Sequence, residues 1–167
     1  MNEAVAVITF DPKNGTPKDL KLTTNLRFKC KRCAALCCKL GGPPLTRKDV
    51  EQIKKAGYRV NDFLEPINRN VKVLPQTCGT LKTRADGSCI FLQSDNEQKQ
   101  FTCSIYDFRP ALCRLYPFSF EKQGSNSIAL KIIPCCMGLN NPEGEQLTEH
   151  FVASRLLEPL MEAMQML

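Results

Sequence analysis

Ten of the 167 residues are cysteines, and several lie within a few residues of another cysteine. The positions are Cys30, Cys33, Cys37, Cys38, Cys78, Cys89, Cys103, Cys113, Cys135 and Cys136. Thiolates two or three residues apart can bind one ion or one cluster, because a tight loop turns the sulfurs inward. The C-x2-C-x3-C run that begins at Cys30 has this spacing. Since four sulfurs complete a zinc site or hold a 4Fe–4S cluster, the set allows two sites, or one site with structural or redox thiols.

Disulfides and unpaired buried thiols are the two alternatives to metal ligation. A bridge within Cys37–Cys38 or Cys135–Cys136 would strain the peptide, because adjacent side chains in extended chain point to opposite sides. The apolar stretch Ala4–Phe10 follows Glu3, has no basic residues before it, and is too short for a secretion signal. We therefore expect a cytoplasmic protein whose thiols stay reduced and bind metal.

The donor set narrows the choice of metal without settling it. His150 is the only histidine, so a zinc finger with histidine ligands is not expected, and His150 is read as an ordinary helix residue. Thiolates are soft ligands, and they favour zinc, iron–sulfur clusters or copper(I) over magnesium and calcium. The sequence leaves zinc and iron–sulfur as alternatives.

The first cysteine run lies in a strongly basic stretch of the sequence. Residues 20–48 contain eight basic side chains and no acidic one, and the net charge of the chain is +6. Cations lower the pKa of neighbouring thiols and offset the charge of about −2 on a four-thiolate site. A solvated basic face is the alternative reading. Because no aromatic platform interleaves these charges, we expect neither DNA nor RNA as partner, and no apolar window is long enough to span a membrane.

Short elements must position these cysteines, and their patterns indicate an α+β fold. We expect a strand over Ala4–Phe10 and a helix after the capping pattern Thr46-x-x-Asp49, ending at Gly57. Asn61 is expected to cap a second short helix. In the first half of the chain we also expect an extended piece at Leu20–Thr24 and short strands at Val71, Val73, Leu81 and Thr83. A turn at Asp86–Gly87 should lead into an extended Ser88–Leu92, followed by a loop over Ser94–Gln100 and a strand over Phe101–Tyr106. The last expected elements of this region are a helical turn from Arg109 to Cys113 and a hairpin that joins Phe118–Phe120 to Ile128–Ile133.

The chain end predicts a helix that opens at Asn141–Pro142, carries Leu147, Phe151, Leu156 and Leu160, and is kinked or broken at Pro159. No linker or repeat divides the sequence. We therefore expect one small cysteine-rich domain over residues 1–167, with a metal-binding region at 28–140 and the C-terminal helix at 141–167.

Two motifs give the sequence a resemblance to a known family. Residues Phe28–Cys38, with Cys30, Cys33, Cys37 and Cys38, resemble the signature of the CxxCxxCC family of YkgJ-type cysteine-cluster proteins. Residues Cys103–Phe118 are similar to that family's pattern C-x-I-Y-x-x-R-P-x-x-C-R-x-Y-P-F. The segments Leu45–Val50, Cys89–Leu92 and Cys135–Gly138 resemble its other elements, so that the likeness covers about residues 28–140.

The resemblance implies a zinc- or iron-chelating domain, related to the cysteine domain of flagellin lysine N-methylases. The first motif of this sequence has one extra residue before Cys37–Cys38. The family has eight cysteines, so two of the ten here are additional, namely Cys78 and one of Cys135 and Cys136. All ten cysteines are candidate metal ligands. Three side chains near Cys113 are candidates for hydrogen-bonding or tuning a bound cofactor, or alternatively for fixing a tight turn: Tyr106, Arg109 and Arg114.

These observations favour a protein with one or two 4Fe–4S clusters that acts in electron transfer, or supports a partner enzyme such as one of protein methylation. A zinc-stabilised interaction module without catalysis is the alternative. An independent enzyme, a lysine methylase or a thiol oxidoreductase, is the third hypothesis, and whether the chain is an enzyme stays open. In each of the first two cases we expect a protein partner.

Overall fold

The computed structural model describes residues 4–67, 76–95 and 100–167, which form two compact units. The sheet unit comprises residues 1–31 and 115–157, and the cysteine unit comprises residues 32–114 and 158–167. Strands and helices occur in both, which confirms the α+β class. The single-domain boundary at 1–167 stays a prediction, and the strands expected at Val71 and Val73 lie outside the described residues.

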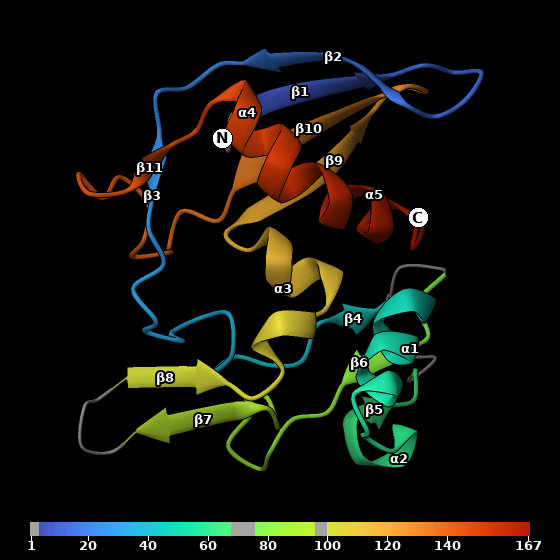
Figure 1. Ribbon diagram of the computed structural model, residues 1–167, viewed down its shortest axis with the longest axis vertical. Coiled ribbons are helices and arrows are strands. Elements are labelled where there is room, and N and C mark those ends of the chain that lie inside the picture. Colours follow the sequence, from blue (N-terminus) through green and yellow to red (C-terminus); the bar gives the residue numbers. More distant parts are fainter. Residues whose placement is uncertain (1–3, 68–75, 96–99) are drawn as a thin grey trace. The chain divides into compact units, whose positions relative to one another are not determined.

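The sheet unit is built on four antiparallel strands in the order β2-β1-β10-β9 (Figure 1). Their bounds are β1 Ala4–Phe10, β2 Pro17–Leu22, β9 Phe118–Gln123 and β10 Ser127–Ile132. Ile8 pairs with Ile128 in the register of β1 and β10, and both side chains are buried. The strand predicted at the N-terminus and the hairpin predicted from Phe118 are therefore confirmed.

Two short strands and a helix complete the sheet unit. Strand β3 (Arg27–Phe28) pairs with β11 (Glu145–Gln146), and Thr148 caps α4 (Glu149–Phe151) by accepting from the Phe151 N–H. The rings of Phe28 and Phe151 both meet Phe118 edge-on, at centroid distances of 6.1 and 6.3 Å. Aromatic packing therefore links the β3 segment and α4 to the sheet.

The C-terminal helix is present, but it begins at Glu149 rather than at Asn141. Asn141 forms a turn instead, because its side chain accepts from the Glu143 N–H and its carbonyl accepts from Gly144. Pro159 does not break the helix. It lies in the first turn of α5 (Leu157–Met164), and a π-helical turn, η2 (Val152–Leu156), precedes that helix. Such a turn is a common adjustment to a disturbed hydrogen-bond ladder.

The cysteine unit contains shorter elements around an apolar core. Helix α1 (Arg47–Lys55) has the predicted capping box, since Thr46 and Asp49 each accept from the other's backbone N–H. Helix α2 (Val60–Phe63) begins after Arg59, so Asn61 lies inside it and is not its cap. Arg59 pairs instead with Asp62 across the helix start.

Small antiparallel pairs supply the remaining elements. Strands β4 (Pro44–Leu45), β6 (Gly79–Leu81) and β5 (Leu64–Glu65) form one sheet, and β7 (Leu92–Asp95) pairs with β8 (Gln100–Cys103). Ser94, Asp95 and Gln100, which were expected in a loop, therefore lie in strands, and residues 96–99 lie outside the described residues. The strand expected over Phe101–Tyr106 ends at Cys103. A 3-10 turn, η1 (Tyr106–Phe108), and helix α3 (Ala111–Leu115) follow. Ile53, Phe63, Leu81, Phe91 and Ile105 are buried in the core.

Candidate metal centre

Five cysteines of the cysteine unit come together from four separate segments of its chain. They are Cys37, Cys38, Cys89, Cys103 and Cys113, and we call them the thiol cluster. Each thiol raises or lowers the pKa of at least one other member, or has its own pKa shifted by one, so that every member is linked to at least two others, which places the five in one region of the unit. The backbone adds a direct link, because the Cys89 N–H donates to the Cys38 carbonyl at 2.7 Å.

The loop that carries Cys37 and Cys38 is held in an unusual conformation. Arg32 and Ala34 have φ values of 50° and 52°, and the Lys39 N–H closes the loop by donating to the Ala34 carbonyl. Gly42 then passes so close to Leu81 that a Cβ atom there would lie 1.6 Å from the Leu81 carbonyl oxygen. Only glycine permits this approach, which anchors the loop to β6.

Apolar side chains surround the thiols on the inner side. Cys38, Cys89 and Cys103 all pack on the same core cluster, which includes Phe91 and Ile105. Cys89 is buried, whereas Cys37, Cys38, Cys103 and Cys113 are partly exposed. The thiol cluster is therefore shielded on one side and open to solvent at its edge.

The environment of the thiols separates Cys37 from the rest. A hydrogen bond with the Cys38 side chain is the main reason that the pKa of Cys37 falls to about 7. The same hydrogen bond and burial raise the pKa of Cys38. Burial also raises the pKa of Cys89, Cys103 and Cys113. Binding of a metal would therefore have to displace protons from most of these thiols.

Arg109 is the cation that acts on three members of the thiol cluster, and Arg84 acts on a fourth, Cys89. Its charge lowers the pKa of Cys37, Cys103 and Cys113, although desolvation outweighs that influence at Cys103 and Cys113. The guanidinium stacks over the Tyr106 ring at 3.7 Å and donates from Nε to the Tyr106 carbonyl at 3.0 Å. Tyr106 thus fixes the arginine, and a role of the two residues in tuning a bound cofactor stays a prediction.

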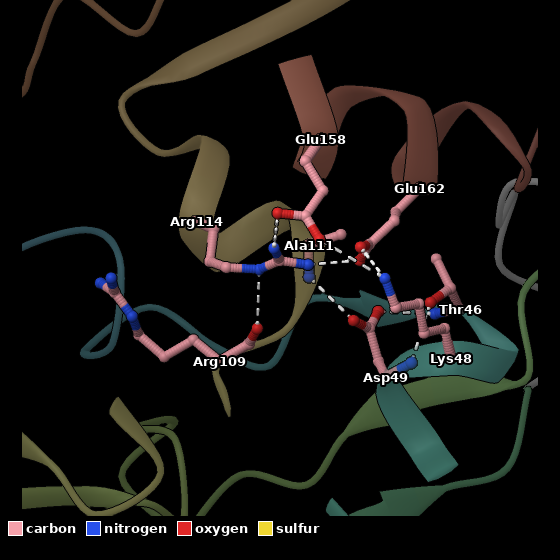
Figure 2. Close-up of polar contacts among 8 residues, drawn as sticks. All are labelled: Thr46, Lys48, Asp49, Arg109, Ala111, Arg114, Glu158 and Glu162. Atoms are coloured by element: carbon pink, nitrogen blue, oxygen red, sulfur yellow. Dashed lines mark hydrogen bonds and ion pairs between the residues drawn. The ribbon is translucent and has the colours of Figure 1, made fainter. Parts of the chain in front are cut away.

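Arg114, by contrast, is turned toward carboxylates (Figure 2). It forms ion pairs with Glu162 and, at 3.8 Å, with Glu158, and its Nε donates to the Arg109 carbonyl. Lys48 reaches the same two carboxylates. We call Lys48, Arg114, Glu158 and Glu162 the ionic network. The sequence did not reveal this network, because the charges come from three distant segments.

Asp49 has a second partner that the capping pattern alone does not predict. Its Oδ1 accepts from the Ala111 N–H at 2.9 Å, while its Oδ2 accepts from the Thr46 N–H at 2.8 Å (Figure 2). The side chain is fully buried, which raises the pKa of its carboxyl despite these bonds. Asp49 therefore joins α1 to the start of α3, the helix that contains Cys113.

The other five cysteines are not joined to the thiol cluster by any interaction that the structure records among its described residues. Cys33 is partly exposed and Cys78 is exposed in the cysteine unit. The sheet unit holds Cys30, Cys135 and Cys136, of which the first two are exposed. In that unit the Lys29 N–H donates to the Gly138 carbonyl at 3.0 Å, so these two residues are neighbours.

The donor chemistry fits a soft metal centre, although the sulfurs are not closed around a single point. Within residues 4–67, 76–95 and 100–167, no three His, Cys, Asp or Glu side chains converge tightly enough to enclose one ion. The thiol cluster nevertheless supplies more than the four sulfurs that a zinc or iron–sulfur site requires. The same part of the chain contains no helix with the length and apolar character needed to cross a membrane.

Comparisons with known proteins agree with this donor set. The family model of CxxCxxCC, whose description is "Putative zinc- or iron-chelating domain", matches residues 29–136, and the chain belongs to this family. The chain is also similar to an uncharacterized protein of Methanocaldococcus jannaschii, MJ0661, with 33% identity over 135 residues, or 79% of this chain and 69% of the relative. No solved structure matches the sequence.

Proposed function

We propose that this chain is an iron–sulfur protein in which the thiol cluster holds a 4Fe–4S cluster. The observation that carries the proposal is the gathering of Cys37, Cys38, Cys89, Cys103 and Cys113 from four segments at one partly shielded place. Membership of a zinc- or iron-chelating family supports it. A bound cluster would supply reversible one-electron chemistry, and the chain's own residues would hold and tune it.

A 4Fe–4S cluster and a single zinc ion place different demands on their ligand sulfurs. Around one zinc ion, tetrahedral geometry with Zn–S bonds of about 2.3 Å puts the sulfurs only about 3.8 Å apart. A 4Fe–4S cluster separates its ligand sulfurs further, because each sulfur binds a different iron. The thiol cluster gathers five sulfurs from four segments, which is enough to supply one sulfur to each of four irons.

Electrostatics support the same proposal. Four thiolates with an oxidised 4Fe–4S core carry a charge of about −2. Arg109 supplies a cation beside the thiols, and its stack on Tyr106 holds the guanidinium in place. Such a group stabilises the anionic centre and raises its reduction potential relative to a neutral side chain.

We further propose that the chain passes electrons to, or supports, a protein partner that performs the chemistry. Among the described residues, those that influence the thiols are Arg109, Asp49, Arg84 and other cysteines, a set that suits holding a charged centre. Protein methylation is the partner reaction suggested by the resemblance to flagellin lysine N-methylases. A reversible one-electron couple in a potentiometric titration would support this role, whereas its absence would leave the centre structural.

The first experiment is purification without air, with iron, zinc and acid-labile sulfide measured on the same sample. We expect iron and sulfide in equal amounts and a broad visible absorption. Cys103→Ser and Cys113→Ser should each lose most of the iron, whereas the exposed Cys78→Ser is the matched control and should retain it. Equal retention by all three variants would contradict the thiol cluster as the binding site.

Zinc binding is the second candidate, and the small size of the elements in the cysteine unit favours it. A unit of short helices and two- to four-residue strands gains stability from a structural metal. In that case the same preparation would contain zinc without sulfide, and a chelator would unfold the cysteine unit. This outcome would overturn the iron–sulfur proposal.

A further inference from the structure

The carboxylate of Asp49 lies in an unusual setting for a capping residue. Asp49 is the third residue of α1 and forms the capping box with Thr46, an arrangement that ordinarily stands at the protein surface. Here the side chain is completely buried. No ion pair to Asp49 is recorded among the described residues, although the neighbouring Lys48 pairs with Glu158 and Glu162.

Burial of a carboxylate without a paired cation is costly, so capping of α1 alone does not explain it. Thr46 already caps the helix, because its hydroxyl accepts from the Asp49 N–H. The additional contact is the bond from the Ala111 N–H to Oδ1 at 2.9 Å, between residues 62 positions apart. The burial is therefore explained by what Asp49 does at α3.

Helix α3 depends on such an external contact. It spans only Ala111–Leu115, and its first intrahelical bond runs from the Arg114 N–H to the Pro110 carbonyl at 3.0 Å. A helix this short does not hold its own conformation in water. Its first N–H groups have no partner within the helix, and Asp49 satisfies the one from Ala111. Cys113 follows Ala111 by two residues, so the same bond restrains the position of its thiol.

We infer that Asp49 is a positioning residue for Cys113, which it holds at the metal centre through the Ala111 amide. The inference rests on the proposed function, in which Cys113 is a ligand. It assigns Asp49 two tasks, one in starting α1 and one in orienting the ligand helix. The charge of Asp49 also contributes to raising the pKa of the Cys113 thiol.

The test compares Asp49→Asn with Thr46→Ala in the full-length chain, purified without air and reconstituted with ferrous iron and sulfide. Asp49→Asn retains the shape of the side chain but places an amide NH2 opposite one of the two backbone N–H groups. Because an NH2 group cannot accept a hydrogen bond, one of the two bonds is lost. Thr46→Ala removes the cap at the Asp49 N–H and the hydroxyl that lowers the pKa of the Asp49 carboxyl, and it leaves the bond from the Ala111 N–H in place. Both variants weaken α1, and only the first disturbs α3.

We expect the iron of Asp49→Asn to be lost to a chelator at least about tenfold faster than that of the wild type, as is usual for residues that orient a ligand. The EPR signal of its dithionite-reduced cluster should shift as well, whereas Thr46→Ala should keep the wild-type loss rate and signal despite a lower unfolding midpoint. Equal loss rates in the two variants would overturn the inference. Iron loss in Cys113→Ser without loss in Asp49→Asn would overturn it while leaving the proposed function intact, and full retention in Cys113→Ser would overturn both.

A measurement on the wild-type chain keeps the test decisive if Asp49→Asn does not fold. Zinc ions serve as a diamagnetic probe, and amide hydrogen exchange is followed by NMR with and without zinc. We expect exchange at Ala111 to slow about tenfold or more on zinc binding, because the bond to Asp49 is then restrained from both sides. Unchanged exchange at Ala111 in the zinc-bound chain would contradict the inference.

Discussion

The ionic network offers a matched pair of glutamates for a stability test. Glu162 is 7% exposed and lies against both Lys48 and Arg114, whereas Glu158 is 73% exposed and reaches the same cations at 3.6 and 3.8 Å. Replacement of either residue by glutamine preserves the shape of the side chain and removes one charge. The two substitutions therefore differ in the burial of the charge that is lost.

The expected magnitude follows from the exposure of the partners. Removal of one member of a fully buried pair costs roughly 3–5 kcal/mol, because a charge is left uncompensated. Arg114 is 22% exposed and Lys48 is 46% exposed, so water can solvate part of what remains. We expect Glu162→Gln to lower the free energy of unfolding by about 2 kcal/mol. For a chain of this length that corresponds to a midpoint lower by about 4–8 °C.

Glu158→Gln should change the free energy of unfolding by no more than about 0.5 kcal/mol, since exposed ion pairs contribute little. The assay is urea unfolding of the reduced, metal-free chain, followed by circular dichroism at two wavelengths to check that the transitions coincide. The reasoning would be refuted if the two variants lost equal stability. It would also be refuted if Glu162→Gln had the same free energy of unfolding as the wild type, because the ionic network would then contribute nothing to stability.

Three further predictions concern the loop anchor, a turn and the cation at the thiols. Gly42→Ala should prevent normal folding or displace the loop, seen as a large loss of unfolding midpoint, because its Cβ would overlap the Leu81 carbonyl. The Ser88 hydroxyl and N–H lower the pKa of Asp86, so this carboxylate stabilises the turn above its ordinary pKa and loses that effect as pH falls through the lower folded value. A carbon-13 NMR titration of Ser88→Ala should show the Asp86 pKa higher than in the wild type, and an unchanged value would contradict this assignment. In the iron-loaded protein, Arg109→Gln should lower the reduction potential in a potentiometric titration, because it removes a cation beside the anionic centre; an unchanged or higher potential would count against that placement.

Local signals in the sequence predicted local elements well. The capping box of Thr46 and Asp49 and the hairpin after Phe118 are both found where the residues indicate. A capping box needs only four residues, and a hairpin needs only a turn between two apolar runs, so the signal lies within one short window. The predicted helix start at Asn141 was wrong because Asn-Pro is equally able to start a turn, and pairing of Glu145 with Phe28 decided between the two.

Side-chain direction could not be predicted in the same way. Arg109 and Arg114 both flank Cys113 and were equivalent candidates in the sequence. In the structure the charge of Arg109 acts on the thiols, whereas Arg114 donates to Glu162, a residue 48 positions away. The choice depends on which carboxylates the fold brings to α3, and no local pattern encodes that.

The cysteines also show that spacing in the sequence does not predict which side chains meet in the fold. Spacing singles out the run Cys30, Cys33 and Cys37. Of these three, the thiol cluster includes Cys37, together with Cys38 and three later cysteines that are isolated in sequence. Spacing detects ligands that share a loop, whereas Cys89, Cys103 and Cys113 come from separate elements whose meeting depends on β7, β8 and α3. The motif from Cys103 to Phe118 was informative because it includes two of these cysteines together with Arg109.

Helix α3 explains why the ligand motif and the charged side chains around it belong together. Five residues cannot maintain a helix, so the position of Cys113 must be imposed from outside. Asp49 holds the first residue of α3, and Glu162 holds Arg114 near its end. These two buried carboxylates come from α1 and α5, so a change in either helix reaches the ligand through a single hydrogen bond or ion pair. A substitution of Glu162 is therefore expected to change both the stability of the cysteine unit and the geometry of the metal centre. A substitution of Thr46 is expected to lower the stability and to leave that geometry unchanged.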